Sequence, residues 1–294
     1  MKTQKALTII TIAICIFAAA ATIAGIWPDS AGEPFTFTSI HGQNVEMQGL
    51  GLYRNDSVST ASQAIAQDVV TLLLGIPILL LSTILALRSS LRGRLIQSGT
   101  LAYFLYTYAA MSFMSAYNPL FLVYVALFSL SLFGFAVSVI RFDVPSFPAA
   151  FSKSFPRLPI AVFIILISAF LLVFQGGRVV MALLQNTIPD VLETYTTLVI
   201  SAMDLGLIVP ASCLAGILLL RKEPWGYLLS AILCMKGISM TTAVTAMVIR
   251  ALLTGLGASV VEIILFPGLT VIGLTLAGLM IRSISDAPGR AAVS

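Results

Sequence analysis

Long apolar runs recur along the whole chain and alternate with short polar segments. A helix needs about 20 consecutive apolar residues to cross the hydrocarbon core of a bilayer, and eight runs reach that length. In chain order they cover 6–27, 68–87, 96–116, 119–140, 160–184, 195–220, 225–253 and 259–281. The pattern predicts an all-α membrane protein with eight transmembrane helices, which has the lipid bilayer as its first partner.

The first apolar run has two interpretations. A basic head with Lys2 and Lys5 precedes it, and the small residues 18–21 would suit cleavage of a signal peptide. The apolar part is longer than the usual signal-peptide core of about 7–15 residues. We therefore favour an uncleaved transmembrane helix.

The segment 28–63 is the longest polar stretch, and it predicts a small β-hairpin between the first two helices. Residues 35–40 alternate between apolar and polar side chains and are rich in residues that favour β-strands. Residues 41–44 are typical of a turn, and residues 45–48 show the same alternation again. Alternation on both sides of a turn is the pattern of a hairpin. We interpret the hairpin as a cap over the helices; a lid over a ligand is the alternative.

The composition agrees with a membrane protein and argues against several kinds of site. Hydrophobic residues make up 59% of the chain and charged residues 10%, against about 25% charged residues in soluble domains. The three cysteines lie in apolar runs without a CxxC pair, and His41 is the single histidine. These counts indicate neither a disulfide framework nor a metal site, and we expect no cofactor.

The basic residues indicate the orientation in the membrane. Of the 16 Lys and Arg residues, 12 lie in loops and tails on one side of the predicted bundle, and only Arg54 lies in a loop on the other. Loops rich in Lys and Arg stay in the cytoplasm. We therefore expect a multi-pass protein of the prokaryotic cytoplasmic membrane with both termini in the cytoplasm. The net charge of +4 then reflects orientation rather than a nucleic-acid partner.

A proline-rich cytoplasmic linker, 141–159, divides the chain into two four-helix halves, 1–140 and 160–294. The halves match weakly when the first is shifted by 133 positions. The residues that coincide are Pro77 with Pro210, Arg88 with Arg221, and Gly93 with Gly226. The match predicts a 4+4 parallel repeat about an axis along the membrane normal. The alternative is two unrelated helix pairs with similar ends.

Two charged residues fall near the middle of adjacent predicted helices. Asp204 lies nine residues from Tyr195, and Lys236 lies eleven residues from Trp225, which places them about 14 and 17 Å from opposite faces at 1.5 Å per residue. A charge at that depth costs about 3 kcal/mol on insertion scales. Because a short loop joins the two helices, we expect the charges to meet. They form either an ion or solute site or a buried pair that locks the helices.

Other polar residues are candidates for the same site. Tyr103 falls at the level of Lys236 under the 133-residue shift, and its buried hydroxyl needs a partner, so we expect it near Asp204. Four charged residues near the outer ends of the helices are candidates for a vestibule: Asp68, Arg178, Arg250 and Glu262. The alternative is that these four side chains are simply solvated at the helix ends.

Several short runs resemble a family of bacterial and archaeal polytopic membrane proteins. They are GLYRND at 51–56, QD at 67–68, LRG at 91–93, NPLF at 118–121, DLG at 204–206, PWGY at 224–227 and KG at 236–237. The resemblance implies the same topology over most of the chain, and it brings no activity, ligand or cofactor with it.

Three functions are open at this point. The first is binding or transport of a small polar or ionic solute between the halves, which a polar cavity at mid-membrane would favour. The second is a sensor or assembly component whose hairpin binds a partner, which a dry, tightly packed bundle would favour. The third is an enzyme acting on a lipid, which a cavity open sideways to lipid with Asp204 or Tyr103 at its wall would favour. The sequence has no P-loop, HExxH or GxSxG motif, so an enzyme has the least support.

Overall fold

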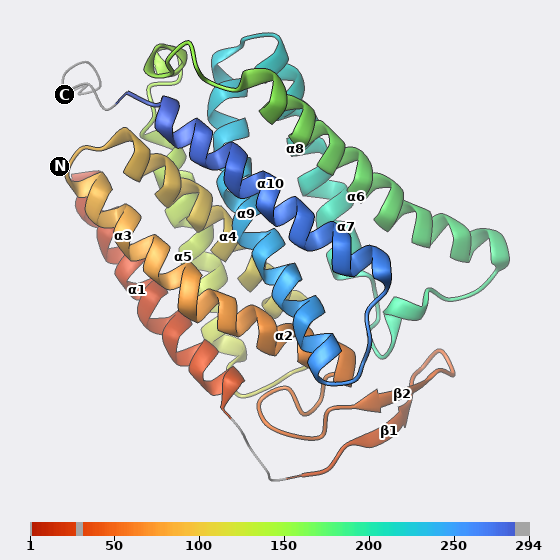
Figure 1. The fold of residues 1–294 in the computed structure, drawn as a ribbon. Coiled ribbons are helices and arrows are strands. Elements are labelled where there is room, and N and C mark those ends of the chain that lie inside the picture. The colour runs from red at the N-terminus through yellow and green to blue at the C-terminus, as the bar shows by residue number, and fades with distance from the viewer. Residues whose placement is uncertain (1, 28–31, 286–294) are drawn as a thin grey trace.

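The computed structural model describes residues 2–27 and 32–285. In these residues eight long helical segments form a bundle, with a two-stranded sheet at one end (Figure 1). The helices are α1 (Lys2–Ile26), α2 (Val58–Val70) continuing into α3 (Ile76–Leu87), α4 (Leu91–Phe113), α5 (Phe121–Ile140), α6 (Arg157–Gln185), α7 (Val199–Met203) continuing into α8 (Val209–Leu220), α9 (Pro224–Leu253) and α10 (Val260–Ser283). The prediction of a helical bundle is confirmed.

The two ends of the bundle differ in what they carry. β1 (Phe35–Thr38) and β2 (Asn44–Met47) pair in antiparallel fashion at one end, which we call the hairpin end. The start of α1 and the end of α10 lie at the other, which we call the termini end (Figure 1). The predicted hairpin between the first two long helical segments is therefore confirmed.

Seven of the eight long segments are long and apolar enough to cross a membrane. The eighth, α4, does not reach the same hydropathy. α4 carries Arg92 and Arg94 near its start and buries polar side chains such as Gln97. It packs against α3, α5 and α9, so other helices surround it, and the side-chain amide of Gln97 donates to the Thr83 hydroxyl at 2.8 Å. The chain is a polytopic membrane protein, and an eighth span stays a prediction.

The second long helix begins ten residues before the apolar run that predicted it. α2 starts at Val58, after Ser57, whose hydroxyl accepts from the backbone N–H of Thr60 at 3.1 Å. A serine at this position satisfies a backbone donor that the first helical turn leaves free. The polar segment 58–63 is thus helical, and the assignment of 28–63 to the hairpin region extends too far.

Two helices contain a wide π turn at the same relative place. Thr71–Gly75 joins α2 to α3, and Asp204–Ile208 joins α7 to α8, 133 positions later. Pro77 and Pro210 each follow near the start of the next helix. Because a proline has no N–H and clashes with the carbonyl four residues back, a wider turn before it relieves the clash. Such π turns are frequent at functional sites.

Buried apolar side chains form two clusters, one within the first half and one at the termini end. One fills the first half around Leu79, Tyr103 and Phe104. The other lies at the termini end and joins the start of α6 and α9 to the end of α8 and α10, with Ile160 and Leu219 fully buried. The linker 141–159 packs its phenylalanines against this second cluster. Packed side chains therefore close the bundle at the termini end.

Candidate functional site

A cavity of about 660 Å³ lies between the helices of the two halves. Residues of α2 and α4 line one side, and residues of α6, α7, α9 and α10 line the other. Its lining runs along α9 from Leu233 to Ala251, which is about 27 Å at 1.5 Å per residue. The volume falls in the range of about 300–1,000 Å³ typical of small-molecule pockets.

Asp204 stands at one wall of this cavity, and both of its carboxylate oxygens are satisfied. The Tyr106 hydroxyl donates to Oδ1 at 2.7 Å, and the Gln175 amide donates to Oδ2 at 2.9 Å. The Ser201 hydroxyl donates to the Gln175 carbonyl oxygen at 3.1 Å, which fixes the orientation of that amide. Only 7% of Asp204 is exposed. Hydrogen bonds from α4 and α6 thus fix the carboxyl group of Asp204, which stands where α7 passes into the π turn.

Lys236 lines the same cavity, and its ammonium is held much less tightly. The side chain is 7% exposed, and Nζ lies 4.1 Å from the centroid of the Tyr106 ring. That cation–π contact is its one specific contact among the residues that the structure describes, and no direct ion pair joins it to Asp204. The three N–H donors of a buried ammonium therefore have no acceptor from the described chain.

The predicted meeting of Asp204 and Lys236 takes an indirect form. The two residues share Tyr106, whose hydroxyl binds the carboxylate and whose ring faces the ammonium. Tyr103, predicted to approach Asp204, instead accepts from the Gln67 amide at 2.6 Å and lies 2.8 Å from the Thr71 hydroxyl.

Sequence reasoning missed Tyr106 and Gln175. The available signals were a second tyrosine three residues after Tyr103 and an amide inside the apolar run 160–184.

The structure divides the four predicted vestibule residues into two pairs. Arg178 and Glu262 line the cavity near the hairpin end. Arg178 stacks over the Phe174 ring at 3.9 Å, and Glu262 also caps the start of α10 by accepting from the Ser259 backbone at 2.8 Å. The lining of the cavity therefore includes charged residues near the hairpin end as well as Asp204 and Lys236.

Asp68 and Arg250 do not line the cavity. Asp68 faces the first half, where its Oδ2 accepts from the Tyr53 hydroxyl at 2.6 Å, and it is buried. Of the four vestibule candidates, Arg178 and Glu262 therefore line this cavity, whereas Asp68 and Arg250 lie outside its lining. Gln67, one residue before Asp68, belongs to the cavity lining instead.

A polar junction at the hairpin end ties the two halves together. Asp56 Oδ1 accepts from the Ala116 backbone N–H and from the Tyr195 hydroxyl, each at 2.8 Å. The Ser57 hydroxyl donates to Glu193, which comes from the same loop as Tyr195. Burial raises the pKa of the Asp56 carboxyl above its usual 3.8, although both hydrogen bonds to the carboxylate act to lower it. The hairpin segment thus connects the first half to the loop between α6 and α7.

Comparison of the chain with protein-family models, with curated proteins and with solved structures finds no match. The resemblance to a prokaryotic membrane-protein family therefore stays a prediction, and the function has to be inferred from the cavity and its residues.

Proposed function

We propose that this protein binds or transports a small solute with an anionic group, and that the anion sits on Lys236 in the cavity between the halves. The observation that carries the proposal is the buried ammonium, which lines the cavity and finds no hydrogen-bond acceptor among residues 2–27 and 32–285. A charge at this depth costs about 3 kcal/mol on insertion scales. A ligand carboxylate or phosphate offsets that cost through charge-assisted hydrogen bonds.

Asp204 has a different role in this proposal. Its oxygens already accept from Tyr106 and Gln175, so it does not need the ammonium as a hydrogen-bond donor. It accepts the hydrogen bond of the Tyr106 hydroxyl, which holds the Tyr106 ring beneath Nζ of Lys236. A solute with a single anionic group then meets a positive donor and a fixed aromatic ring.

The 4+4 parallel repeat, with halves 1–140 and 160–294 around the linker 141–159, is part of the same proposal. The two π turns, 133 positions apart, support it. So do Ser89 and Lys222, which end α3 and α8 with left-handed φ values of 63° and 64°. α4 and α9 are equivalent under this shift, and they pack against each other between the halves.

Transport follows from this arrangement more readily than simple binding. Repeats related by an axis along the membrane normal commonly hold their substrate near mid-membrane and move as two bodies. The cavity reaches exposed residues at the hairpin end, Leu256 and Gly257, and stops at Phe163 and Ile164 beside the second apolar cluster. Rocking of the halves would open the termini end and close the hairpin end.

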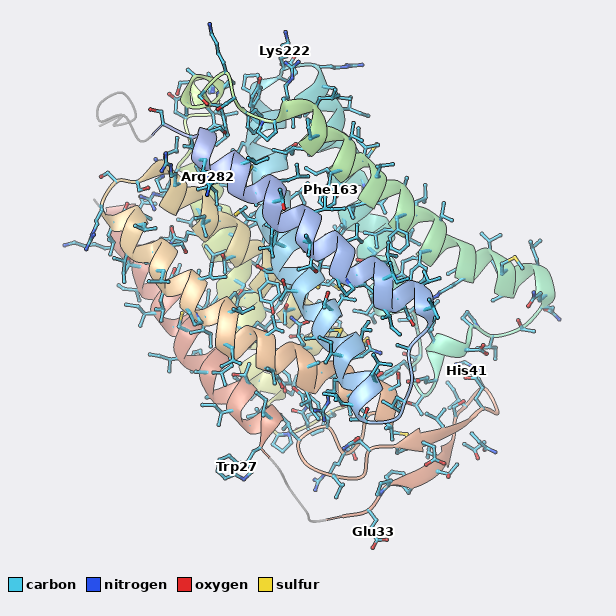
Figure 2. The ribbon with its side chains drawn as sticks, in the orientation of Figure 1. Trp27, Glu33, His41, Phe163, Lys222 and Arg282 are labelled. Atoms are coloured by element: carbon cyan, nitrogen blue, oxygen red, sulfur yellow. The ribbon has the colours of Figure 1, made fainter. Side chains whose placement is uncertain are left out.

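We propose the termini end as the cytoplasmic one, in the inner membrane of a prokaryote. Lys222 and Arg282 lie there, opposite to Trp27 and His41 (Figure 2). Basic loops stay in the cytoplasm. An alkaline phosphatase reporter inserted after Asp56 is therefore expected to be active, and one inserted after Pro148 inactive. The reverse pattern would overturn this orientation.

Anion binding is expected to raise the melting temperature of the parent protein but not that of Lys236→Met. A ligand that binds the folded state alone stabilises it by about 2.7 kcal/mol at a hundred times its Kd. The measurement is thermal unfolding in nanodiscs of zwitterionic lipid with acetate, benzoate, inorganic phosphate, decanoate and the cation decyltrimethylammonium as probes. Lys222→Met, a change at an exposed loop residue, is the matched control and should respond like the parent.

The proposal fails if no anion stabilises the parent, or if Lys236→Met responds equally. That result would favour the hairpin as the functional part, since the side chains of Phe35 and Phe37 in β1 are each 47% exposed and a two-stranded sheet leaves both strand edges open to a partner.

A further inference from the structure

We propose that the ligand is a single-chain amphiphile, an acidic head group on an aliphatic chain, which enters the cavity from the bilayer between α6 and α10. The inference rests on the proposed function, because it places the head group on Lys236. It adds the chemical class of the ligand and its route.

The walls of the cavity fit an aliphatic chain better than a hydrophilic solute. Between Lys236 and the charged rim at Arg178, the lining is mostly aliphatic, aromatic and methionine side chains. Four methionines belong to it: Met111, Met114, Met240 and Met247. Methionine is unbranched and flexible, so it adapts to apolar ligands of irregular shape. The volume is spread along about 27 Å of α9, which leaves a long, narrow space.

The deep end of the cavity has room for a head group beside the ammonium. Gly237 follows Lys236 and also lines the cavity. A methyl group built on Gly237 would meet no atom within 4 Å. An acidic group can therefore approach Nζ without displacing a side chain.

α6 and α10 border the cavity but do not form a packed helix pair. α6 packs against α8, whereas α10 packs against α9. Phe163 lies toward α10 (Figure 2) and comes within 3.8 Å of a methyl group built on Gly273. From there to the hairpin end, side chains such as Phe170 and Leu269 form the wall. In a bilayer, lipid chains would adjoin the cavity along this side.

A sideways opening also suits an enzyme acting on a lipid. Both oxygens of Asp204 are engaged by Tyr106 and Gln175, however, which favours binding of the amphiphile over chemistry on it.

α6 and α10 each contain a short sequence at which a helix can bend. α10 has Pro267 followed by Gly268, and a methyl group on Gly268 would meet nothing within 4 Å. α6 has Gly176 followed by Gly177, which is equally unobstructed. A proline removes a helical hydrogen bond, and helices kink at proline and at pairs of small residues. Bending at these two sites widens the passage without breaking the bundle.

The ligand class is tested by comparing probes that share a chain or a charge. Submicellar decanoate is expected to raise the melting temperature of the protein in nanodiscs by roughly 5 °C or more at a hundred-fold excess over its Kd. Two control probes are expected to change the melting temperature by less than a fifth of that shift. Acetate has the charge without the chain, and decyltrimethylammonium has the chain with the opposite charge. Gly237→Leu is expected to abolish the rise in melting temperature caused by decanoate. The matched control is Gly278→Leu on α10, where a side chain also meets open space, and this variant should show the same rise as the parent.

Two failures are distinguishable in this experiment. Equal shifts by acetate and decanoate would overturn the amphiphile and leave an anion on Lys236 in place. A decanoate shift that survives in Lys236→Met, or equal shifts by decanoate and decyltrimethylammonium, would overturn the proposed function as well.

The route is tested by quenching of tryptophan fluorescence with phospholipids brominated on their chains. The reporter is Met240→Trp on α9, in a chain with Trp27→Phe and Trp225→Phe, and the reference is Tyr108→Trp, at a position 2% exposed in the first apolar cluster. We expect the reporter to be quenched at least twice as strongly as the reference, and added decanoate to reduce its quenching. Quenching no stronger than that of the reference would overturn the lateral route.

Discussion

Asp204→Leu is expected to lower the melting temperature by roughly 6–15 °C, whereas Lys236→Met is expected to leave it within about 2 °C of the parent or to raise it. Loss of the carboxylate removes the acceptor of Tyr106 and of Gln175, and a buried polar group left without a partner costs about 1–3 kcal/mol. It also removes the negative charge nearest to a buried ammonium. Removing one partner of a directly bonded buried ion pair typically costs about 3–5 kcal/mol, and this range is an upper limit here because Tyr106 stands between the two residues.

Lys236 differs because its ammonium makes no hydrogen bond with the described residues. Methionine has a similar length and loses a cation–π contact worth about 2 kcal/mol or less, while the cost of burying a charge disappears. The measurement is thermal unfolding of the parent, both single variants and the double variant. If both single variants are equally destabilised and the double variant recovers stability together with anion binding, the two residues are a structural lock and not a binding site.

The helices and the hairpin were predictable because their signals are local. An apolar run of about 20 residues predicts a span wherever it occurs, and alternation around a turn predicts a hairpin. The common depth of Asp204 and Lys236 also follows from counting residues along two helices. These features do not depend on which neighbour each helix finds.

The contacts of the site depend on which face each helix presents, and no local signal determines that. Tyr103 and Tyr106 are three residues apart, so their side chains differ by about 60° around the axis of a helix with 3.6 residues per turn. The packing of α4 against α3 and α9 decides that Tyr103 meets Thr71 and Tyr106 meets Asp204. Similarly, Gln67 and Asp68 are adjacent in α2, yet Gln67 borders the cavity and Asp68 faces Tyr53.

The π turns explain a further part of what the sequence did not show. A π turn adds a residue to one turn, so the face presented by every later residue shifts relative to a regular helix. Asp204 stands at the first position of such a turn. Pro210 was visible in the sequence, but a proline near a helix start is common and did not indicate a π turn before it.

Gly93→Ala and Gly226→Ala are expected to destabilise the protein by similar amounts, about 1–3 kcal/mol each, because both glycines lie where one helix turns tightly into the next. A methyl group on Gly93 would lie 2.7 Å from the Ala86 backbone nitrogen, and one on Gly226 would lie 2.2 Å from the Leu219 backbone nitrogen. Backbone atoms at these distances yield only if the whole turn moves. The same change at Gly278, where nothing lies within 4 Å, should instead stabilise the helix by up to about 1 kcal/mol.

The pair of variants also separates a true repeat from coincidence. Residues 86 and 219 stand 133 positions apart, as do the two glycines, so a repeat requires the same clash in both turns. Two unrelated helix pairs would have no reason to share it. We therefore expect the two losses in melting temperature, measured beside Gly278→Ala, to agree within a factor of two. If one substitution is harmless while the other unfolds the protein, the halves are not equivalent, and transport by rocking of two matched bodies loses its structural basis.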